Sequence, residues 1–232
     1  MMRLDRLLAN MKFGSRREVQ DMIFLGQVTI NGEVTTKKDR KVNPNLDKIV
    51  VNGEEIYYKE EIILAMNKPI GYLSANRDDM HPVVIDLLKP PYHRHNFKIA
   101  GRLDLDAEGL LILTTSGKTV HLISNPNQNI VKTYEVTTNL SINDKMLLRL
   151  LEPIRLLDGM NNPYLAKAIE VSKIGNNIAT ISIDSGKYHQ VKRMFKAIGY
   201  EVTNLKRIKI GKYLLSNLKP GEYLEIALED IL

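Results

Sequence analysis

The segment that most constrains the fold is a short apolar run held between glycines within residues 101–117, GRLDLDAEGLLILTTSG. Such a run, residues 110–113, bounded by turn-forming residues, is typical of a buried strand. Arg102 and Asp104 come just before it, two residues apart, and in an extended chain this spacing places both side chains on one face. A carboxylate beside a fixed cation suits a nucleophile or a base. On spacing alone an ordinary surface ion pair is the favoured explanation, because structural ion pairs are common.

Composition narrows the class of protein. The chain has 232 residues, of which 44% are hydrophobic, so it can form a packed core of one large domain or two smaller ones. Its net charge of +6 favours polyanionic partners. It has no cysteine, which excludes disulfides, thiolate metal sites and a thiol nucleophile. With no apolar run of membrane-spanning length and no signal peptide, we expect a cytoplasmic protein without a membrane partner.

Cofactor and metal signatures are missing from the sequence. The five histidines do not follow metal-ligand spacing. There is no Walker loop and no dinucleotide-binding fingerprint. We therefore expect the chemistry to run without a metal or a cofactor.

Residues 1–59 read as a small helix-helix-hairpin module. Apolar positions at helical spacing predict helices over residues 3–11 and 16–25, with Ser15 as the cap of the second. Strands are expected near residues 28–30 and 48–51, with turns at Asn31-Gly32 and Asn52-Gly53. Basic residues are concentrated in this module: Arg3, Arg6, Lys12, Arg16, Arg17, Lys37, Lys38, Arg40 and Lys41. Such a basic face is either an RNA-binding surface or an ordinary solvated one.

Residues 60–232 read as a second domain rich in strands. The pattern predicts one helix over residues 188–198 and a strand over residues 133–137 at one edge of a sheet. Further strands are expected at residues 62–68, 110–113, 178–183, 203–205, 207–210 and 223–228. Many strands with few helices indicate an α+β domain on a mostly antiparallel sheet.

Three motifs of this second domain together resemble the bacterial pseudouridine synthases that modify ribosomal RNA. GRLD in the first segment matches the family's aspartate motif, although Ala107 replaces the usual Thr or Ser. The resemblance implies that Asp104 is the catalytic aspartate, with Arg102 helping to hold a flipped nucleotide. Lys-Thr-Tyr at 132–134 implies that Tyr134 stacks on the target base. YHQVKRM at 188–194 implies that Lys192, an arginine in many relatives, pairs with the aspartate.

Residues 2–57 resemble the S-four RNA-binding module, named after a ribosomal protein. In that family the helix pair packs a basic face against structured RNA, through contacts that position the protein rather than read sequence. The resemblance implies RNA contacts by several residues of the module and of the last motif: Arg3, Arg6, Ser15, Arg16, Arg17, Lys37, Lys38, His189, Gln190 and Arg193.

The form of the last motif points to one branch of the pseudouridine synthase family. Tyr-His-Gln-Val-Lys-Arg resembles the small-subunit branch, which implies one uridine of 16S rRNA, position 516 in common numbering. The large-subunit branches more often have an Asn-Arg-Gln type of sequence there, and an enzyme acting on 23S rRNA is the alternative. A non-catalytic ribosome-assembly factor is the alternative of another class. We expect a monomer whose partner is structured rRNA or a small-subunit assembly particle.

Overall fold

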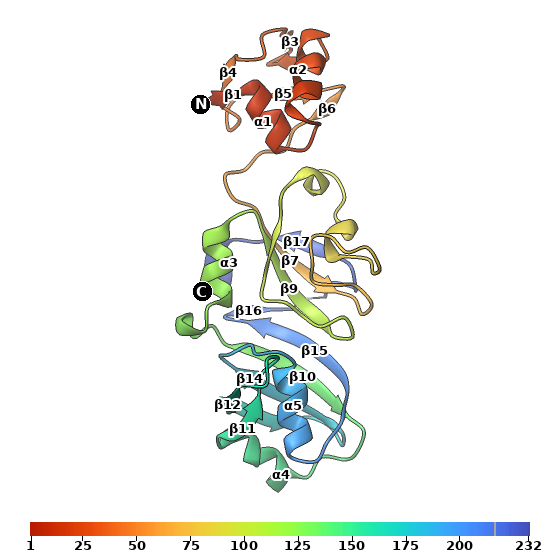
Figure 1. The fold of residues 1–232 in the computed structure, drawn as a ribbon, viewed down its shortest axis with the longest axis vertical. Coiled ribbons are helices and arrows are strands. Elements are labelled where there is room, and N and C mark those ends of the chain that lie inside the picture. The colour runs from red at the N-terminus through yellow and green to blue at the C-terminus, as the bar shows by residue number, and fades with distance from the viewer. Residues whose placement is uncertain (216) are drawn as a thin grey trace. The chain divides into compact units, whose positions relative to one another are not determined.

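A computed structural model describes residues 1–215 and 217–232, which form two compact units (Figure 1). The first unit comprises Met1–Ile62 together with Ile85–Phe97, and the second comprises Ile63–Val84 together with Lys98–Leu232. The inclusion of residues 85–97 in the first unit was not predicted. A domain boundary at residues 59 and 60 remains a proposal. Within the described residues, the helices are too short or too polar to cross a membrane.

The first unit packs two helices, α1 (Leu4–Asn10) and α2 (Arg16–Phe24), over a small sheet. Ser15 begins α2 as predicted: its hydroxyl accepts a hydrogen bond from the Glu18 amide, and the Glu18 carboxylate accepts one from the Ser15 amide. Strand order in the sheet is β3-β2-β5-β6, and β1 pairs separately with β4. Their bounds are β1 Met2–Arg3, β2 Val28–Ile30, β3 Glu33–Val34, β4 Lys41–Val42, β5 Ile49–Val51 and β6 Glu54–Glu55.

Apolar side chains from both helices and the sheet form the core of this unit. The helical spacing read from the sequence is the cause, because it brings one stripe of each helix onto the strands. The residues of this core include Leu4, Leu7, Leu8, Val19, Ile23, Val28, Ile30, Ile49 and Val51. The segment 85–97 is held to the same unit by a bidentate ion pair, in which Arg94 donates to Glu54 at 3.1 and 2.9 Å.

The second unit is built on one nine-stranded sheet with the order β13-β14-β10-β15-β9-β7-β17. β16 pairs with β15, β8 pairs with β9, and β9 with β15 is the parallel pair in an otherwise antiparallel sheet. The predicted α+β class with a mostly antiparallel sheet is confirmed. Strand bounds are β7 Ile63–Lys68, β8 Lys98–Ala100, β9 Glu108–Thr114, β10 Lys132–Thr138, β13 Glu170–Lys173, β14 Ile178–Ile183, β15 Val202–Ile210, β16 Tyr213–Leu214 and β17 Tyr223–Glu225.

Helices and a separate hairpin complete the second unit. The hairpin is β11 (Ile154–Leu157) with β12 (Pro163–Ala166). The helices are α3 Gly117–Ser124, α4 Asp144–Leu148 and α5 Gln190–Ala197. Short 3₁₀ turns are η1 Val84–Leu87, η2 Tyr92–Arg94, η3 Pro126–Gln128, η4 Arg149–Leu151 and η5 Leu228–Asp230.

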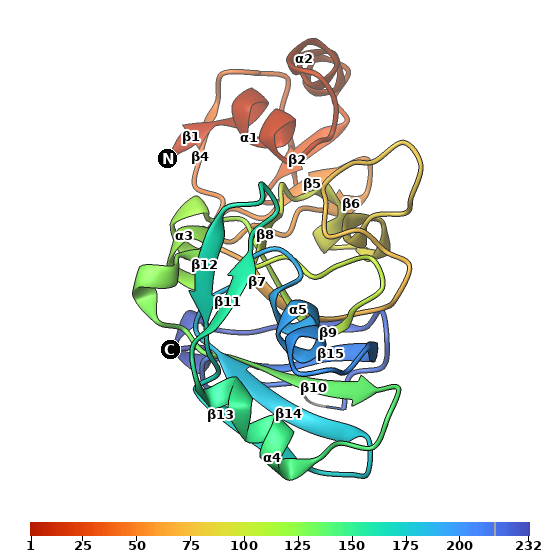
Figure 2. The ribbon, with the colours of Figure 1, turned by 60° about the horizontal axis from the view of Figure 1, so that its bottom comes forward.

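Two apolar clusters support the sheet. One lies around β10, β14 and α5, whose ribbons are drawn in Figure 2. Helix α5 contributes Val191, Met194 and Phe195 to this cluster. The other gathers side chains of β7, β9 and α3, including Ile63, Leu110, Ile112 and Ile123. The candidate catalytic loop, residues 101–107, begins and ends on strands of this sheet, so rigid neighbours hold both of its ends.

Three sequence-based expectations for this unit were wrong. Strand β10 is interior, between β14 and β15, and does not lie at an edge. Buried and half-exposed side chains alternate along β10 because one face of the sheet packs on the core while the other face is half-exposed. The two strands expected over residues 203–210 are one continuous β15. Helix α5 begins two residues later than expected, because His189 adopts a left-handed backbone conformation with φ of 51°.

Candidate active site

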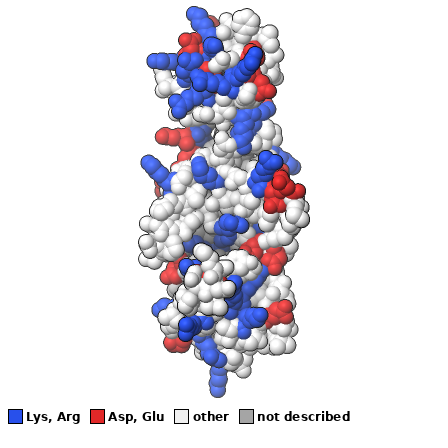
Figure 3. Space-filling model, viewed as in Figure 1, with Lys and Arg blue, Asp and Glu red and all other residues white. Residues whose placement is uncertain are grey.

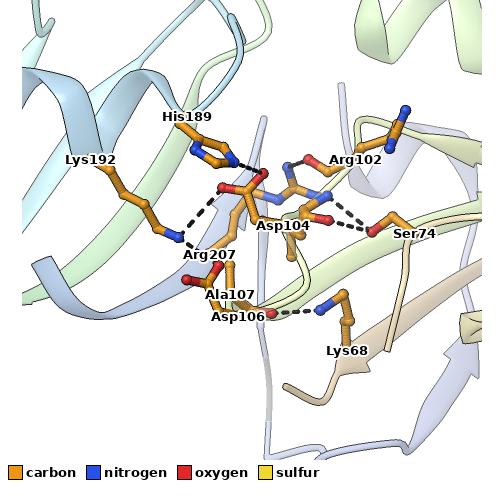
Figure 4. Close-up of polar contacts among 10 residues, drawn as sticks. Lys68, Ser74, Arg102, Asp104, Asp106, Ala107, His189, Lys192 and Arg207 are labelled. Atoms are coloured by element: carbon orange, nitrogen blue, oxygen red, sulfur yellow. Dashed lines mark hydrogen bonds and ion pairs between the residues drawn. The ribbon is translucent and has the colours of Figure 1, made fainter. Parts of the chain in front are cut away.

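Asp104 lies in a loop that buried polar contacts hold in place (Figure 4). The Ser74 hydroxyl donates to the Leu103 carbonyl at 2.8 Å and accepts from the Leu103 amide at 3.1 Å. On the other side, the Ala107 amide donates to the Asp104 carbonyl at 3.2 Å, which closes a turn. The backbone of Asp104 is therefore fixed on both sides, while its side chain stays 28% exposed.

Two basic side chains, one from α5 and one from the residue before it, lie near the Asp104 carboxylate. His189 Nε2 is 3.5 Å from Oδ1, and Lys192 Nζ is 3.7 Å from Oδ2. Lys192 also donates a 2.6 Å hydrogen bond to Asp106 Oδ1, and this bond lowers the pKa of the Asp106 carboxyl. The sequence-based pairing of Lys192 with Asp104 is thus present in the geometry. A carboxylate beside a fixed cation is the arrangement expected of a nucleophile or a base.

Arg102 does not share a face with Asp104, contrary to the sequence-based expectation. Figure 4 shows its side chain directed away from the aspartate. The period-two rule fails here because residues 102–104 belong to a loop, preceded by Gly101 with φ of 81°, and not to a strand. Arg102 is exposed and borders the same cavity as Asp104, so contact with substrate remains a proposal for it.

Asp104 faces a cavity of about 730 Å³, which is large enough for a nucleotide. Tyr134, on β10, borders it and is only 7% exposed. Its other walls come from β15, from the candidate catalytic loop and from the loop before α5. Cationic or aromatic side chains line the cavity, including Arg102, Lys132, Lys187, Tyr188, His189 and Arg207. One carboxylate, several cations and several aromatic rings therefore line the same cavity, and this lining suits an anionic substrate that contains a base.

Arg207 is a buried cation of this cavity that the sequence did not reveal. It is 2% exposed and donates hydrogen bonds to backbone carbonyls of Leu110 at 2.7 Å and Gly101 at 2.8 Å. Its guanidinium carbon lies 6.0 Å from the centre of the Tyr134 ring. Arg207 therefore connects the strand that follows the catalytic loop to the strand that carries Tyr134. In the sequence it resembled one of several charges alternating along a strand.

Two buried lysines at the site also could not be recognised from sequence. Lys68, at the end of β7, donates to the Ala107 carbonyl at 2.6 Å and so supports the turn after Asp104. Lys132, at the start of β10, is 6% exposed and borders the cavity. Burial lowers the pKa of each amine to about 8. In the sequence, Lys68 stands in Asn-Lys-Pro and Lys132 in Lys-Thr-Tyr, and these short motifs were the only signs that either lysine could belong to the site.

The other residues expected to bind RNA near α5 have different surroundings. His189 reaches Asp104 and stacks on Tyr188 with ring centres 3.8 Å apart. Gln190 is buried: its carbonyl accepts from the Lys187 amide and its amide donates to Ser185, so we do not propose that it contacts RNA. Arg193 donates to the Leu157 carbonyl and does not border the cavity.

The basic residues of the first unit divide into two groups. Arg3 and Arg16 flank the buried carboxylate of Asp5, whose pKa is lowered chiefly by the hydrogen bonds from Arg3. Ser15 is occupied by its capping bonds, which gives it a structural role. Figure 3 shows Lys and Arg side chains gathered over the first unit. The remaining predicted RNA contacts of this unit are also exposed: Arg6, Arg17, Lys37 and Lys38.

Comparisons with known proteins agree with this geometry. Residues 62–197 match the model of the RNA pseudouridylate synthase family, and residues 2–48 match the S4 domain. A Bacillus subtilis protein described as an uncharacterized RNA pseudouridine synthase is 40% identical, covering 99% of this chain and 97% of its own. The large subunit pseudouridine synthase B of the same organism is 37% identical, covering 100% and 94%.

A relative named as a small subunit synthase and a solved structure are also similar to this chain over nearly its full length. The small subunit pseudouridine synthase A of Escherichia coli is 33% identical, covering 99% of this chain and 98% of its own. A crystal structure of a pseudouridylate synthase is 31% identical with a TM-score of 0.67, covering 100% and 98%. The chain therefore belongs to the RNA pseudouridylate synthase family and carries an N-terminal S4 domain.

Proposed function

We propose that this enzyme isomerises one uridine of 16S ribosomal RNA, position 516 in common numbering, to pseudouridine, and that Asp104 is its catalytic residue. The observation that carries the chemistry is the Asp104 carboxylate, held by a rigid loop between His189 and Lys192 at the wall of the cavity. The Tyr-His-Gln-Val-Lys-Arg form of residues 188–193 supports the small-subunit target. Tyr188 and His189 of this motif border the same cavity.

The reaction follows from these parts. The target uridine leaves its stack, which costs a few kcal/mol, and enters the cavity. Asp104 either bonds to the anomeric carbon or removes a neighbouring sugar proton, and both routes break the bond from that carbon to ring nitrogen N1. The bonding electrons go to the uracil ring. The ring turns, its carbon C5 bonds to the anomeric carbon, and Asp104 leaves or returns the proton.

The final step restores the conjugation of the ring. The proton on C5 is lost to solvent and N1 gains one, so that substrate and product are isomers and no oxidant or co-reactant is consumed. In this scheme Lys192 holds its positive charge beside the Asp104 carboxylate, and Tyr134 stacks on the base. Arg102 helps to hold the flipped nucleotide from the rim, and the exposed Arg6, Arg16, Arg17, Lys37 and Lys38 neutralise phosphates.

A 23S rRNA target is the second candidate. It is favoured by the 37% identity to a large subunit synthase, which exceeds the 33% identity to the small subunit synthase. A non-catalytic assembly factor is not retained, because the chain belongs to a family of enzymes.

The direct test is to map pseudouridine in both ribosomal RNAs from cells lacking this protein. Loss of a single 16S site that returns with the wild-type gene but not with Asp104→Asn supports the proposal. Loss of a 23S site with intact 16S rRNA would assign the enzyme to the large-subunit target.

A further inference from the structure

Lys132 is a buried cation whose charge has no partner in the part of the chain that the structure describes. Lys132 is only 6% exposed, and among the described residues its ammonium forms neither a hydrogen bond nor an ion pair. Asp184 attracts the charge and Arg207 repels it, without a direct bond to either. Burial of most of the side chain disfavours its charged form, yet Nζ is not sealed from solvent and Lys132 borders the cavity.

The position of Lys132 places its charge inside the candidate active site. Lys132 and Tyr134 are two residues apart on β10, both are buried, and both border the 730 Å³ cavity. Residues at that spacing on a strand point to the same face. Lys132 therefore lies on the cavity side of the sheet, beside the tyrosine proposed to stack on the target base.

Depth in the cavity indicates which part of the substrate the ammonium meets. A flipped nucleotide stays joined to the RNA on both sides, so its phosphates must remain near the mouth while the base enters furthest. The exposed Arg102 is available at the rim for phosphate. The lysine at position 132, which is almost fully removed from solvent, is placed for the base.

The reaction creates negative charge on that base. Whichever route Asp104 takes, cleavage of the bond to N1 leaves the electron pair on uracil, where it spreads over the ring and its two carbonyl oxygens. A fixed cation in a water-poor cavity stabilises such developing charge far better than it would in water.

We propose that the Lys132 ammonium binds the uracil ring and stabilises the negative charge that the ring carries after the glycosidic bond breaks. This makes Lys132 a second catalytic residue, acting on the base while Asp104 acts on the sugar. The inference rests on the proposed chemistry of Asp104, but it does not depend on which ribosomal RNA is the substrate.

The test is single-turnover kinetics with Lys132→Met on whichever rRNA transcript the wild-type enzyme modifies. We expect the rate at saturating RNA to fall by about 10²–10³-fold, as when other charge-stabilising donors are removed. RNA affinity and its salt dependence should stay within twofold of wild type. The exposed lysine variant Lys145→Met serves as the control and should keep the wild-type rate.

A second substrate separates charge stabilisation from a loss of local structure. Fluorine on ring carbon C5 withdraws electrons, so a 5-fluorouracil anion needs less help from a cation. With 5-fluorouridine in the transcript, the Lys132→Met defect in consumption of the target nucleoside should shrink by about tenfold or more. An equal defect on both substrates, or an unchanged rate, would overturn the proposal.

Weaker RNA binding with a reduced salt slope and a normal rate would instead identify a phosphate contact, and would also overturn it. Failure of the proposed target is distinguishable: the wild-type enzyme would then leave the 16S transcript unmodified. The Lys132 test would proceed on the 23S transcript.

Discussion

Lys192 donates a 2.6 Å hydrogen bond to Asp106, while its ammonium lies 3.7 Å from the carboxylate of Asp104. One cation thus bridges both carboxylates of the Leu-Asp-Leu-Asp sequence. The Asp106 side chain is 72% exposed, and that of Lys192 only 20%. The hydrogen bond to the exposed Asp106 carboxylate therefore fixes the Lys192 side chain, and this places the ammonium beside the less exposed Asp104 carboxylate.

Replacing Lys192 tests whether charge is its contribution. Lys192→Met should lower the single-turnover rate strongly, by about 10²-fold, because Asp104 loses its nearest ammonium. Lys192→Arg should remain within about tenfold of wild type, because the charge is kept while the geometry of the donor changes. Rates are measured at saturating RNA. Equal activity of the two variants would make Lys192 an ordinary surface residue.

Gly109 is a position where a side chain would collide with the backbone of Arg207. Its φ is 103°, and an added Cβ would lie 2.3 Å from the Arg207 carbonyl oxygen. Gly109→Ala should therefore lower the free energy of unfolding by about 3 kcal/mol or more, measured by denaturant titration. Gly221→Ala is the matched control, with φ of 86° and open space around its Cβ, and should cost about 1 kcal/mol.

The buried lysines make stability depend on pH in the alkaline range. In the unfolded chain a lysine has a pKa near its ordinary 10.5, whereas burial lowers the pKa of Lys132 to about 8, with Arg207 adding to the effect and Asp184 opposing it. Between these values the unfolded chain binds more protons, so the free energy of unfolding rises with pH.

Lys132→Met should remove the part of that rise that Lys132 contributes, while the part from Lys68 remains. Relative to the variant, wild-type stability should increase between pH 8 and 10.5 by up to about 1.4 kcal/mol per pH unit. Denaturant titrations across this range provide the measurement, and Lys145→Met should follow the wild type. A difference between wild type and Lys132→Met that does not change with pH would show that Lys132 is protonated alike in both states.

The basic face of the S4 domain should determine the salt dependence of RNA binding. Arg16 and Arg17 are both exposed, and Arg16 is only loosely paired with Asp5 at 3.6 Å. Changing both to Ala should weaken binding and reduce the slope of log K against log salt by up to about 2, because each arginine would neutralise about one phosphate. Chemistry at saturating RNA should be unaltered. A wild-type slope in the double variant would assign this face to another partner.

The elements that could be predicted from sequence are those with strong local signals. Helix α2 has a capping residue, an apolar stripe and a terminating glycine, and β14 is rich in β-branched residues, so both were located. The hairpin β11–β12 and helix α4 were not, because short, partly polar segments carry no such periodicity. The interior position of β10 depends on pairing with β14 and β15, which are distant in sequence.

The site was predicted in part, for a similar reason. Asp104, Tyr134 and Lys192 were found through motif resemblance, and the structure places Asp104 and Tyr134 on one cavity with Lys192 beside Asp104. Arg207 and Lys132 were missed because burial of a charge is a tertiary property that a charged letter in a strand does not reveal. Arg102 was misplaced because the strand geometry assumed for residues 102–104 is replaced by a loop.

The central claim, that Asp104 forms pseudouridine in this cavity, is tested most directly by release of tritium from rRNA labelled at carbon C5 of uracil. The wild-type enzyme should release label until one site per transcript is converted, because the C5 proton is lost only when the new bond forms. Asp104→Asn should bind the same RNA with nearly wild-type affinity and release none. Release by Asp104→Asn within tenfold of the wild-type rate would contradict the account.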